Sequence, residues 1–322
     1  MPDVSVIVPA HDAAATIGRT LEALGRQEFG GSFEVVVVDD RSTDATAAIA
    51  TRAGARVVPT AAQSGPAGAR NAGIAATDAP LVAFTDADCE PAPGWLAGLA
   101  AGLGGADLVL GPVLPDPRVE VGPFDRTLRL VAQSPRFETA NMGVRREMLE
   151  RVGGFEPFAP DPAAPRPGLR PRPDQGHFGE DAVFGWRAVR AGARTTFCEA
   201  ALVHHAVFPR GPRGYMAEKW RLRYFPALVR EIPEIRETLP LGVFLSQRTA
   251  LFDLAAAGAV ATAATRRPWP LAAAIPYVSR SLRTRDPWRR SVWRHNLAVV
   301  CGDAIGLAAL LRGSAAARRL LL

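Results

Sequence analysis

Two aspartates end a short apolar segment, and carboxylates at this spacing suit a divalent cation. Residues 81–85 are expected to form a buried strand because the run is short, apolar and preceded by Pro80. Asp86 and Asp88 follow directly. In open α/β sheets the carboxyl ends of strands line the ligand crevice, where hard oxygen ligands bind Mg²⁺ or Mn²⁺ shared with substrate phosphates. The pair alone also fits a solvated acidic turn.

A second acidic pair follows another expected strand. Residues 33–38 are apolar and end at Asp39 and Asp40, and a helix is expected from residue 43. One of these carboxylates could accept a hydrogen bond from the ring N–H of a nucleotide base. The alternative is that the acids, together with Asp44, only cap the turn before the helix.

A glycine-rich segment, residues 65–74, leads into a further expected helix. It lacks the glycine spacing of the dinucleotide fingerprint and the lysine of the P-loop. Its small residues would let the backbone approach a ligand closely. Arg70 within it could pair with a diphosphate or a base carbonyl.

Strands and helices alternate along the first part of the chain, which predicts an α/β fold with a doubly wound, mainly parallel sheet. The expected strands are residues 4–9, 33–38, 56–59, 81–85, 107–113, 194–198 and 201–204, and the expected helices are residues 13–27, 43–53, 68–77, 94–102 and 179–191. In such a sheet the two acidic pairs fall on one edge, which favours a shared site.

Charge divides the 322 residues unevenly. Residues 1–205 carry 25 acids against 19 arginines, whereas residues 206–322 carry 7 acids against 18 arginines and Lys219. The basic part favours an anionic surface, and its long Ala/Leu stretches without base-stacking motifs fit anionic lipid better than nucleic acid. Three distant cysteines, Cys89, Cys198 and Cys301, indicate neither a disulfide framework nor a zinc cluster. The first residues show no signal peptide.

The last 82 residues are apolar and basic. The apolar runs 254–265, 268–279 and 304–311 are each shorter than the roughly 18 residues expected of a spanning helix. Aromatic residues lie among the arginines, as interfacial anchors do; they are Trp269, Tyr277, Trp288 and Trp293. Two interpretations stay open, a helical appendage packed on the first domain or a hairpin at a membrane surface.

Taken in order, the motifs of residues 3–210 resemble those of family 2 glycosyltransferases with the GT-A fold. The matching segments are VIVPAH (6–11), VVDDRSTD (37–44), GARNAGI (68–74), TDAD (85–88), TANMGVRR (139–146), VGGF (152–155) and GED (179–181). The combination is much more specific than any one segment.

This resemblance implies a role for each matching residue. Asp39 and Asp40 would help hold the nucleotide base, in a pocket lined by Pro9 and His11. Asp86 and Asp88 would serve the diphosphate and its metal, with Asp88 touching the metal and Asp86 nearer the ribose. Asp181 would be the catalytic base, with Glu180 beside it among the donor-binding residues; a buried structural cap is the alternative for Asp181.

Other polar residues are weaker candidates. Asn141 could touch the donor sugar or instead cap a helix that begins near Arg145. His205, more than His204, could complete the metal coordination. A basic group further on could contact the diphosphate or an anionic acceptor, although a solvated basic face is the simpler interpretation; it comprises Arg210, Arg213, Lys219 and Arg221.

Two departures from the family pattern limit the prediction. The Gln-x-x-Arg-Trp motif of processive members is absent, and residues 218–221 (EKWR) only partly resemble it, so polymer extrusion is not expected. A proline-rich segment, residues 157–173, interrupts the acceptor side and is expected to be a loop.

The sequence therefore predicts a GT-A domain at residues 1–210, a basic connection at 211–240 and a helical region at 241–322. The expected activity is inverting, non-processive, Mg²⁺- or Mn²⁺-dependent transfer of a sugar from a nucleoside diphosphate to an acceptor hydroxyl. A glycan or lipid-linked acceptor of the cell envelope and a place at the inner face of the plasma membrane are expected, without a nucleic acid partner. The alternatives are a nucleotidyltransferase that makes the sugar nucleotide and a noncatalytic sugar-nucleotide-binding protein.

Overall fold

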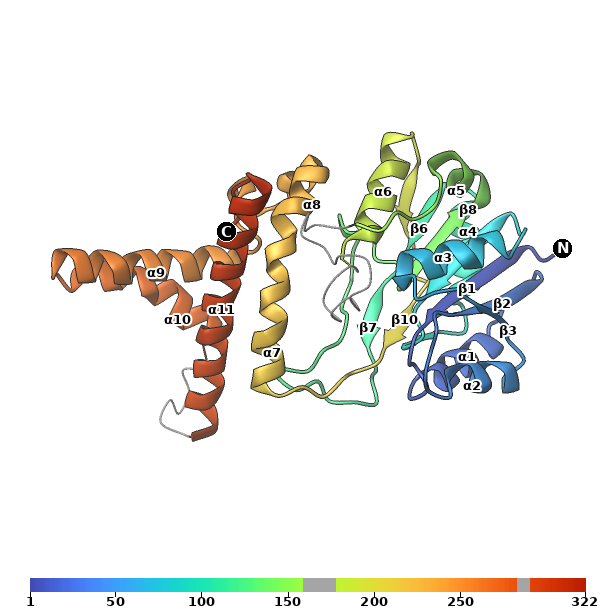
Figure 1. The fold of residues 1–322 in the computed structure, drawn as a ribbon, viewed down its shortest axis with the longest axis horizontal. Helices are drawn as coiled ribbons and strands as arrows, with labels where there is room; N and C mark the ends of the chain where they lie inside the picture. Colours follow the sequence, from blue (N-terminus) through green and yellow to red (C-terminus); the bar gives the residue numbers. More distant parts are fainter. Residues whose placement is uncertain (159–177, 283–289) are drawn as a thin grey trace. The chain divides into compact units, whose positions relative to one another are not determined.

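The computed structural model describes residues 1–158, 178–282 and 290–322 (Figure 1). Most of the expected proline-rich loop, and Trp288, lie outside these residues. The chain divides into two compact units, of which the first comprises residues 1–122 and 126–208 and the second residues 123–125 and 209–322. The three-part division expected from the sequence stays a prediction about how the chain folds.

A seven-stranded sheet forms the centre of the first unit, in the order β3-β2-β1-β4-β8-β6-β9. Its strands are β1 (Val4–Ala10), β2 (Phe33–Asp39), β3 (Arg56–Pro59), β4 (Leu81–Thr85), β6 (Leu108–Leu110), β8 (Asn141–Arg145) and β9 (Thr195–Phe197). Only β8 runs antiparallel to its neighbours, β4 and β6. The mainly parallel α/β sheet expected from the sequence is therefore present.

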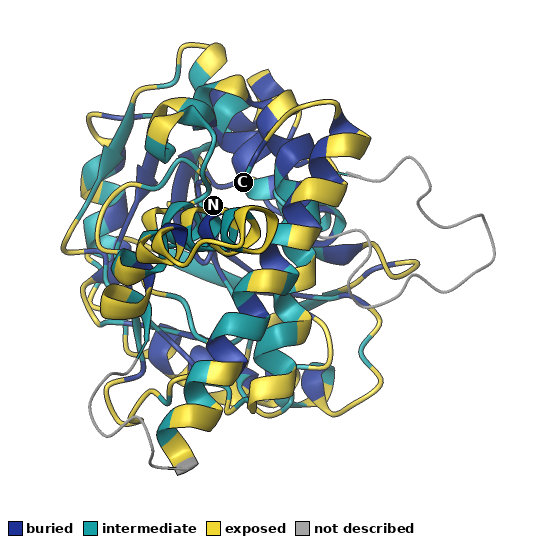
Figure 2. Ribbon diagram, turned by 90° about the vertical axis from the view of Figure 1, so that its left-hand side faces the viewer, coloured by how far each residue is buried: buried dark blue, intermediate teal, exposed yellow. Residues whose placement is uncertain are grey.

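Helices cover both faces of this sheet, and the strands are buried on both sides. Along β1, Val6 and Val8 belong to one hydrophobic cluster and Ile7 to the other, as the alternation of side chains in a strand requires. Helical ribbons in Figure 2 change repeatedly between buried and exposed residues, and the helices of the first unit contain buried residues among more exposed ones. They are α1 (Ile17–Gly25), α2 (Thr46–Arg52), α3 (Gly65–Ala75), α4 (Trp95–Leu103), α5 (Arg146–Val152) and α6 (Glu180–Arg190).

The strand register brings the acidic residues to one edge. β1 pairs with β2 up to Ala10 opposite Asp39, and β4 pairs with β8 from Thr85 opposite Asn141. Asp39 ends β2 and Asp86 directly follows β4, and because both strands run parallel to β1 the two residues lie at the same carboxyl edge, as the sequence predicts.

A small second sheet, in the order β5-β10-β7, adjoins this edge and was only partly expected. It contains β5 (Cys89–Pro91), β7 (Val113–Pro115) and β10 (Val203–His205). The single strand expected at 107–113 was wrong: β6 and β7 are separate strands in different sheets, and Gly111 and Pro112 lie between them. Proline lacks the N–H that a continuous ladder needs.

The second unit is helical. It contains α7 (Pro212–Lys219), η1 (Trp220–Tyr224), α8 (Phe225–Glu231), η2 (Pro233–Thr238), η3 (Pro240–Gly242), α9 (Gln247–Thr265), η4 (Trp269–Ala274), α10 (Ile275–Ser281) and α11 (Arg290–Ala317). Asp303 of α11 accepts hydrogen bonds from Arg248 of α9 at 2.9 Å and from Tyr277 of α10 at 2.6 Å, so one carboxylate joins three helices.

One helix among the described residues is long and apolar enough to cross a membrane. It spans Ser291–Ala317, and 44% of its apolar window is buried within the structure. The uninterrupted apolar runs in this region remain shorter than about 18 residues, and this helix reaches spanning length only because it also includes charged residues such as Asp303 and Arg312. Length and composition alone do not distinguish a spanning helix from a core helix.

The close approach of α3 to the sheet leads to a stability prediction. A Cβ added at Gly73 would lie 2.5 Å from Ile7 Cγ2 and 3.1 Å from Val38 Cγ2, and both neighbours are buried side chains of central strands. Gly73→Ala is expected to lower the free energy of unfolding by about 1–3 kcal/mol through overpacking. Urea denaturation measures the change.

Gly25→Ala is the matched control. Gly25 is also helical, but nothing lies within 4 Å of an added Cβ there. Higher helix propensity should leave this variant as stable as the parent or more stable by up to about 1 kcal/mol. Equal effects of the two substitutions would contradict the packing argument.

Candidate functional site

The guanidinium of Arg70 is the centre of the site. Arg70 lies on α3, its side chain is only 4% exposed, and it contacts three carboxylates. Nη2 donates to Asp86 Oδ1 at 3.2 Å, and Nη1 donates to Glu180 Oε1 at 3.2 Å and to Asp181 Oδ1 at 3.0 Å. The ring of Phe155 lies 5.5 Å from the guanidinium carbon. One cation thus joins the end of β4 to the start of α6.

The start of α6 presents Asp181 to this edge. Gly179 precedes the helix with φ +77°, a left-handed conformation that glycine adopts without a steric penalty. Asp181 Oδ2 accepts a hydrogen bond from the backbone N–H of Thr139 at 3.1 Å, while Oδ1 accepts from Arg70. Both carboxylate oxygens are therefore oriented by fixed donors, and the side chain stays 22% exposed.

Burial raises the pKa of Asp181 above its usual range. The positive charge of Arg70 and the Thr139 N–H oppose this change, whereas the neighbouring Glu180 and Asp86 carboxylates add to it. Because Arg70 is one cation among three carboxylates, it balances only part of their charge. A carboxylate in this state is a stronger base than a solvated one.

Asp88 and His205 face each other next to this cluster. His205 Nε2 lies 3.6 Å from Asp88 Oδ2, and His205 Nδ1 lies 2.6 Å from the carbonyl oxygen of Ala206. A carbonyl oxygen only accepts, so Nδ1 carries a proton in this contact, and in the neutral imidazole Nε2 keeps its lone pair. Burial and Asp86 raise the pKa of Asp88, and His205 and Arg126 oppose this rise.

These groups fit a divalent cation. A carboxylate oxygen and an imidazole nitrogen with a free lone pair are suitable ligands for Mn²⁺, and the Nδ1 hydrogen bond fixes the imidazole orientation as in known metal sites. Asp86 lies on the other side of Ala87 and shares its carboxylate with Arg70. The structure thus brings Asp88 and His205 together, whereas neither Asp86, which faces Arg70, nor His204 is in the ligand cluster found among the described residues.

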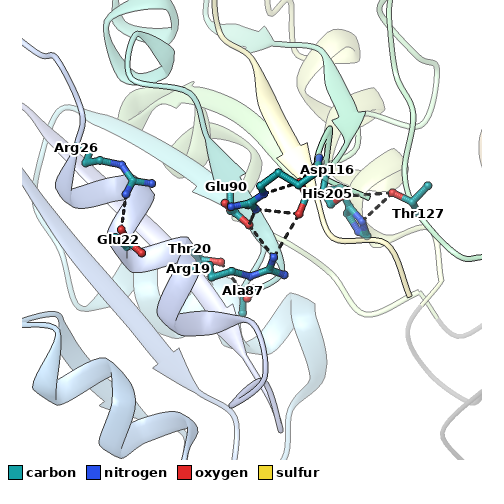
Figure 3. A network of polar contacts seen from close by, with 10 residues as sticks. Arg19, Thr20, Glu22, Arg26, Ala87, Glu90, Asp116, Thr127 and His205 are labelled. Carbon is teal, nitrogen blue, oxygen red and sulfur yellow. Dashed lines mark hydrogen bonds and ion pairs between the residues drawn. The ribbon is translucent and has the colours of Figure 1, made fainter. Parts of the chain in front are cut away.

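A polar network behind these ligands was not found from the sequence (Figure 3). The Thr20 hydroxyl of α1 donates to the carbonyl oxygen of Ala87 at 3.0 Å. The backbone N–H of Asp116 donates to the carbonyl oxygen of His205 at 2.9 Å. The Asp116 carboxylate accepts from Arg118 at 2.8 Å and Arg19 at 3.3 Å. Of these six residues, Asp116 and Arg118 lie more than 20 positions from every motif, so no local signal identified them.

The two aspartates after β2 differ in the structure. Asp40 is buried and accepts from the Thr60 hydroxyl, from the Ser64 N–H and hydroxyl, and from the Gly65 N–H, at 2.7–3.0 Å. Its carboxylate thus anchors the start of α3, and contact of Asp40 with a nucleotide base stays a prediction. Asp39 is half-buried, and the one hydrogen bond described for its carboxylate is from the Ser42 N–H at 3.3 Å.

Pro9 and His11 lie at the end of β1, next to the end of β2. Pro9 pairs with Val38 in the sheet, and His11 Nδ1 contacts the Asp40 carbonyl oxygen at 2.9 Å. His11 Nε2 lies 3.1 Å from Gln63 Nε2.

Asn141 lies in the core, where its side chain is hydrogen-bonded to other parts of the protein; its contact with the donor stays a prediction. Its Oδ1 accepts from the indole N–H of Trp95 at 2.8 Å, and its Nδ2 donates to the carbonyl oxygens of Pro112 and Ala201. It begins β8 rather than a helix. Glu180 is also buried and faces Arg70, so it supports the site through that arginine.

The basic group expected after the catalytic part belongs to the second unit. The backbone N–H of Arg210 donates to the Asp125 carboxylate, and its Nε donates to the Phe124 carbonyl oxygen of the same unit. Lys219 lies over the ring of Tyr215 at 5.0 Å. Arg210 and Lys219 thus contact other parts of the second unit, and a role of this basic group in binding the diphosphate or an acceptor stays a prediction.

Comparison with known proteins identifies similar chains. The model of a family described as glycosyl transferase family 2 matches residues 5–153. Glycosyltransferase AglE of Haloferax volcanii is 30% identical over 227 residues, which cover 66% of this chain and 69% of that protein. The pre-mycofactocin glycosyltransferase of Mycobacterium tuberculosis is 30% identical over 224 residues, which cover 63% of this chain and 42% of that protein.

Solved structures share the fold. The mannosyltransferase PcManGT from Pyrobaculum calidifontis, solved with GDP-Man and Mn²⁺, has a TM-score of 0.62 at 25% identity, over 95% of this chain and 87% of that one. S. aureus TarS with UDP-GlcNAc has a TM-score of 0.50 at 16% identity, over 97% of this chain and 91% of that one, which is a likeness of fold alone.

The Asp116 network leads to a prediction about pH. Hydrogen bonds from Arg118 lower the pKa of Asp116 from 3.8 to about 2. A lowered folded-state pKa contributes stability that is complete above about pH 4 and lost as the pH falls towards 2. Because both arginines are more than 40% exposed, we expect Asp116→Asn to cost only about 1–2 kcal/mol at pH 7. Denaturant unfolding measures this cost.

The difference in unfolding free energy between parent and Asp116→Asn should shrink as the pH is lowered from 5 towards 3. Asp78→Asn, at an exposed position, should change stability little at either pH. A difference that stays constant with pH would contradict the assigned cause.

Proposed function

The chain belongs to glycosyltransferase family 2, and on this premise we propose that it transfers a sugar from a nucleoside diphosphate to an acceptor hydroxyl by a single, inverting displacement that depends on a divalent cation. The observation that carries this proposal is the Arg70 guanidinium, which holds Asp86 and Asp181 at 3.2 and 3.0 Å. Because Arg70 contacts both carboxylates, a catalytic base (Asp181) and a carboxylate for the diphosphate (Asp86) lie close enough together to act on one bound donor.

Asp181 is the proposed base. It removes the acceptor hydroxyl proton as that oxygen attacks the anomeric carbon, and the bond from that carbon to the diphosphate oxygen breaks on the opposite side. The raised pKa suits this task, because the carboxylate then has a higher affinity for the proton. Arg70 and the Thr139 N–H keep its two oxygens in place while the proton is taken.

Asp88, His205 and Asp86 are the proposed holders of the cation. When bound, Mn²⁺ or Mg²⁺ neutralises the leaving diphosphate. The imidazole Nε2 and the Asp88 carboxylate oxygen face each other at 3.6 Å, and Thr20 and Asp116 hold the backbone on either side of them. PcManGT was solved with Mn²⁺ and GDP-Man, which supports Mn²⁺ as the first cation to test and GDP-mannose as the first donor.

The nucleotide base of the donor is proposed to bind against Asp39, Pro9 and His11. Asp40 is left out because its carboxylate accepts hydrogen bonds from other residues of the protein.

The proposed acceptor is a hydroxyl of a glycan or lipid-linked glycan, and the proposed product belongs to the cell envelope. Transfer is expected to be non-processive because the Gln-x-x-Arg-Trp motif is absent. Pyrophosphate release from a nucleoside triphosphate would favour a nucleotidyltransferase instead. A protein that binds donors without transferring or hydrolysing them would be noncatalytic.

Asp181→Asn tests the proposed base. The variant keeps the shape and a hydrogen-bonding oxygen but cannot take the proton, so kcat is expected to fall by about 10²–10⁴-fold. Transfer from GDP-, UDP- and dTDP-sugars with Mn²⁺ measures it. The rise in melting temperature with donor and Mn²⁺ should persist, because ligand binding stabilises the folded state by mass action.

Asp78→Asn, an exposed carboxylate outside the site, is the matched control and should keep parental kcat. Full transfer activity in Asp181→Asn would overturn the base assignment. Loss of both donor binding and activity in the variant would instead assign Asp181 to the binding of the donor.

The second unit supports a further part of the proposal, attachment to the cytoplasmic surface of a membrane. Around η4 and α10 several large apolar side chains are exposed, among them Trp269 at 69% and Ile275 at 65%. Arg266, Arg267 and Arg280 are exposed in the same segment. An apolar surface edged by arginines fits a membrane interface that contains anionic lipid.

Trp269→Ser combined with Ile275→Ser tests this attachment. Removing two large apolar side chains that would enter the interface should weaken binding to phosphatidylcholine–phosphatidylglycerol vesicles by at least about tenfold. Vesicle co-sedimentation measures it. Val131→Ser, which alters an exposed apolar side chain of the first unit, should bind as the parent does. Equal binding of all three proteins, or no binding by the parent, would contradict membrane attachment.

A further inference from the structure

The strand register places a cysteine in the proposed cation site. In the antiparallel pair of β5 and β10, Cys89 lies directly opposite His205. Residues opposite each other in such a pair carry their side chains on the same face of the sheet. Asp88 precedes Cys89, and its carbonyl oxygen accepts a hydrogen bond from the Ala206 N–H at 2.9 Å. The backbone on both sides of the pair is therefore fixed.

The three side chains converge. Cys89 Sγ lies 3.8 Å from Asp88 Oδ1, and His205 Nε2 lies 3.6 Å from Asp88 Oδ2. One ligand atom from each of the three residues lies within 4.8 Å of the other two. Cys89 and His205 are buried, and Asp88 is half-buried. One ion could contact all three after small movements of the side chains.

Sulfur changes which cation this set prefers. Mg²⁺ and Mn²⁺ are bound best by oxygen ligands, whereas a thiolate favours Zn²⁺ and other thiophilic cations. Zn²⁺ is commonly bound by four ligands drawn from cysteine sulfur, histidine nitrogen and carboxylate oxygen. Asp88, Cys89 and His205 supply one of each kind, which leaves one position for water or a phosphate oxygen.

We propose that Cys89 is a third protein ligand at this site and that, together with Asp88 and His205, it binds a thiophilic divalent cation such as Zn²⁺ in competition with Mg²⁺ or Mn²⁺. As the sulfur–metal bond forms, the thiol proton passes to solvent. Zn²⁺ bound in this way inhibits transfer, because it occupies the place of the catalytic cation with a different geometry. This inference rests on the proposed function only for the inhibition; the binding of the ion is independent of it.

Co²⁺ provides a direct test, since a cobalt–thiolate bond gives an intense near-ultraviolet charge-transfer band that oxygen and nitrogen ligands do not give. The full-length Cys198→Ser/Cys301→Ser variant keeps Cys89 as its only cysteine. Titration of this variant with Co²⁺ should give the band with one ion per chain, and added Zn²⁺ should abolish it. Absence of the band in this variant and in the parent would overturn the proposal. This test leaves the buried Cys89 unchanged.

Cys89→Ala provides the second measurement. With Cys198 and Cys301 intact, this variant should lose the band, and its affinity for Zn²⁺ should fall by at least about tenfold while its affinity for Mn²⁺ changes by less than about threefold. Equal losses for both cations in a variant with parental melting temperature would contradict a thiophilic role. If the protein transfers sugar with Mn²⁺ but gives no cobalt–thiolate band, the proposed function is kept and only the inference about Cys89 is overturned.

Discussion

The Arg70 guanidinium is the interaction on which the candidate site depends. Three carboxylates that converge at one sheet edge repel one another, and burial makes that repulsion stronger than it would be in water. Arg70 contacts all three, so it holds the end of β4 and the start of α6 together. Arg70 is positioned by α3. The Asp40 carboxylate anchors the start of this helix, and Gly73 allows the helix to lie close to β1. Removing one charged side chain from such a group is expected to lower the stability of the folded protein, because the remaining charges stay buried without their partner.

A separate set of contacts fixes the cation side. The small sheet places His205 opposite Cys89, and Thr20 and Asp116 hold the backbone around Ala87 and His205 from behind. The positioning residues thus act on the backbone rather than on the ligand atoms of Asp88 and His205. The two halves of the site meet at residues 86–88: Asp86 turns to Arg70, and Asp88 turns to His205. This alternation explains why two carboxylates one residue apart serve different partners.

Much of this could be predicted from the sequence, because it depends on local patterns. Short apolar runs ending in acids identified β2 and β4, and parallel pairing then required Asp39 and Asp86 to share an edge. What could not be predicted depends on contacts between distant segments. The core position of Asn141 follows from Trp95, Pro112 and Ala201, and the anchoring role of Asp40 follows from how the chain returns at Ser64 and Gly65. The proximity of Cys89 to His205 follows from the register of two three-residue strands, which no spacing reveals.

The central claim is that Arg70 and the residues around it form a site for a nucleoside diphosphate and its cation next to Asp181. A crystal structure of the protein with GDP or UDP and Mn²⁺, with the cation located by its anomalous scattering, tests this claim most directly. The account predicts one manganese peak within ligand distance of Asp88 and His205, with the diphosphate on that ion and the Asp181 carboxylate facing the open side. A peak on other residues, or a diphosphate bound away from the Arg70 edge, would contradict it.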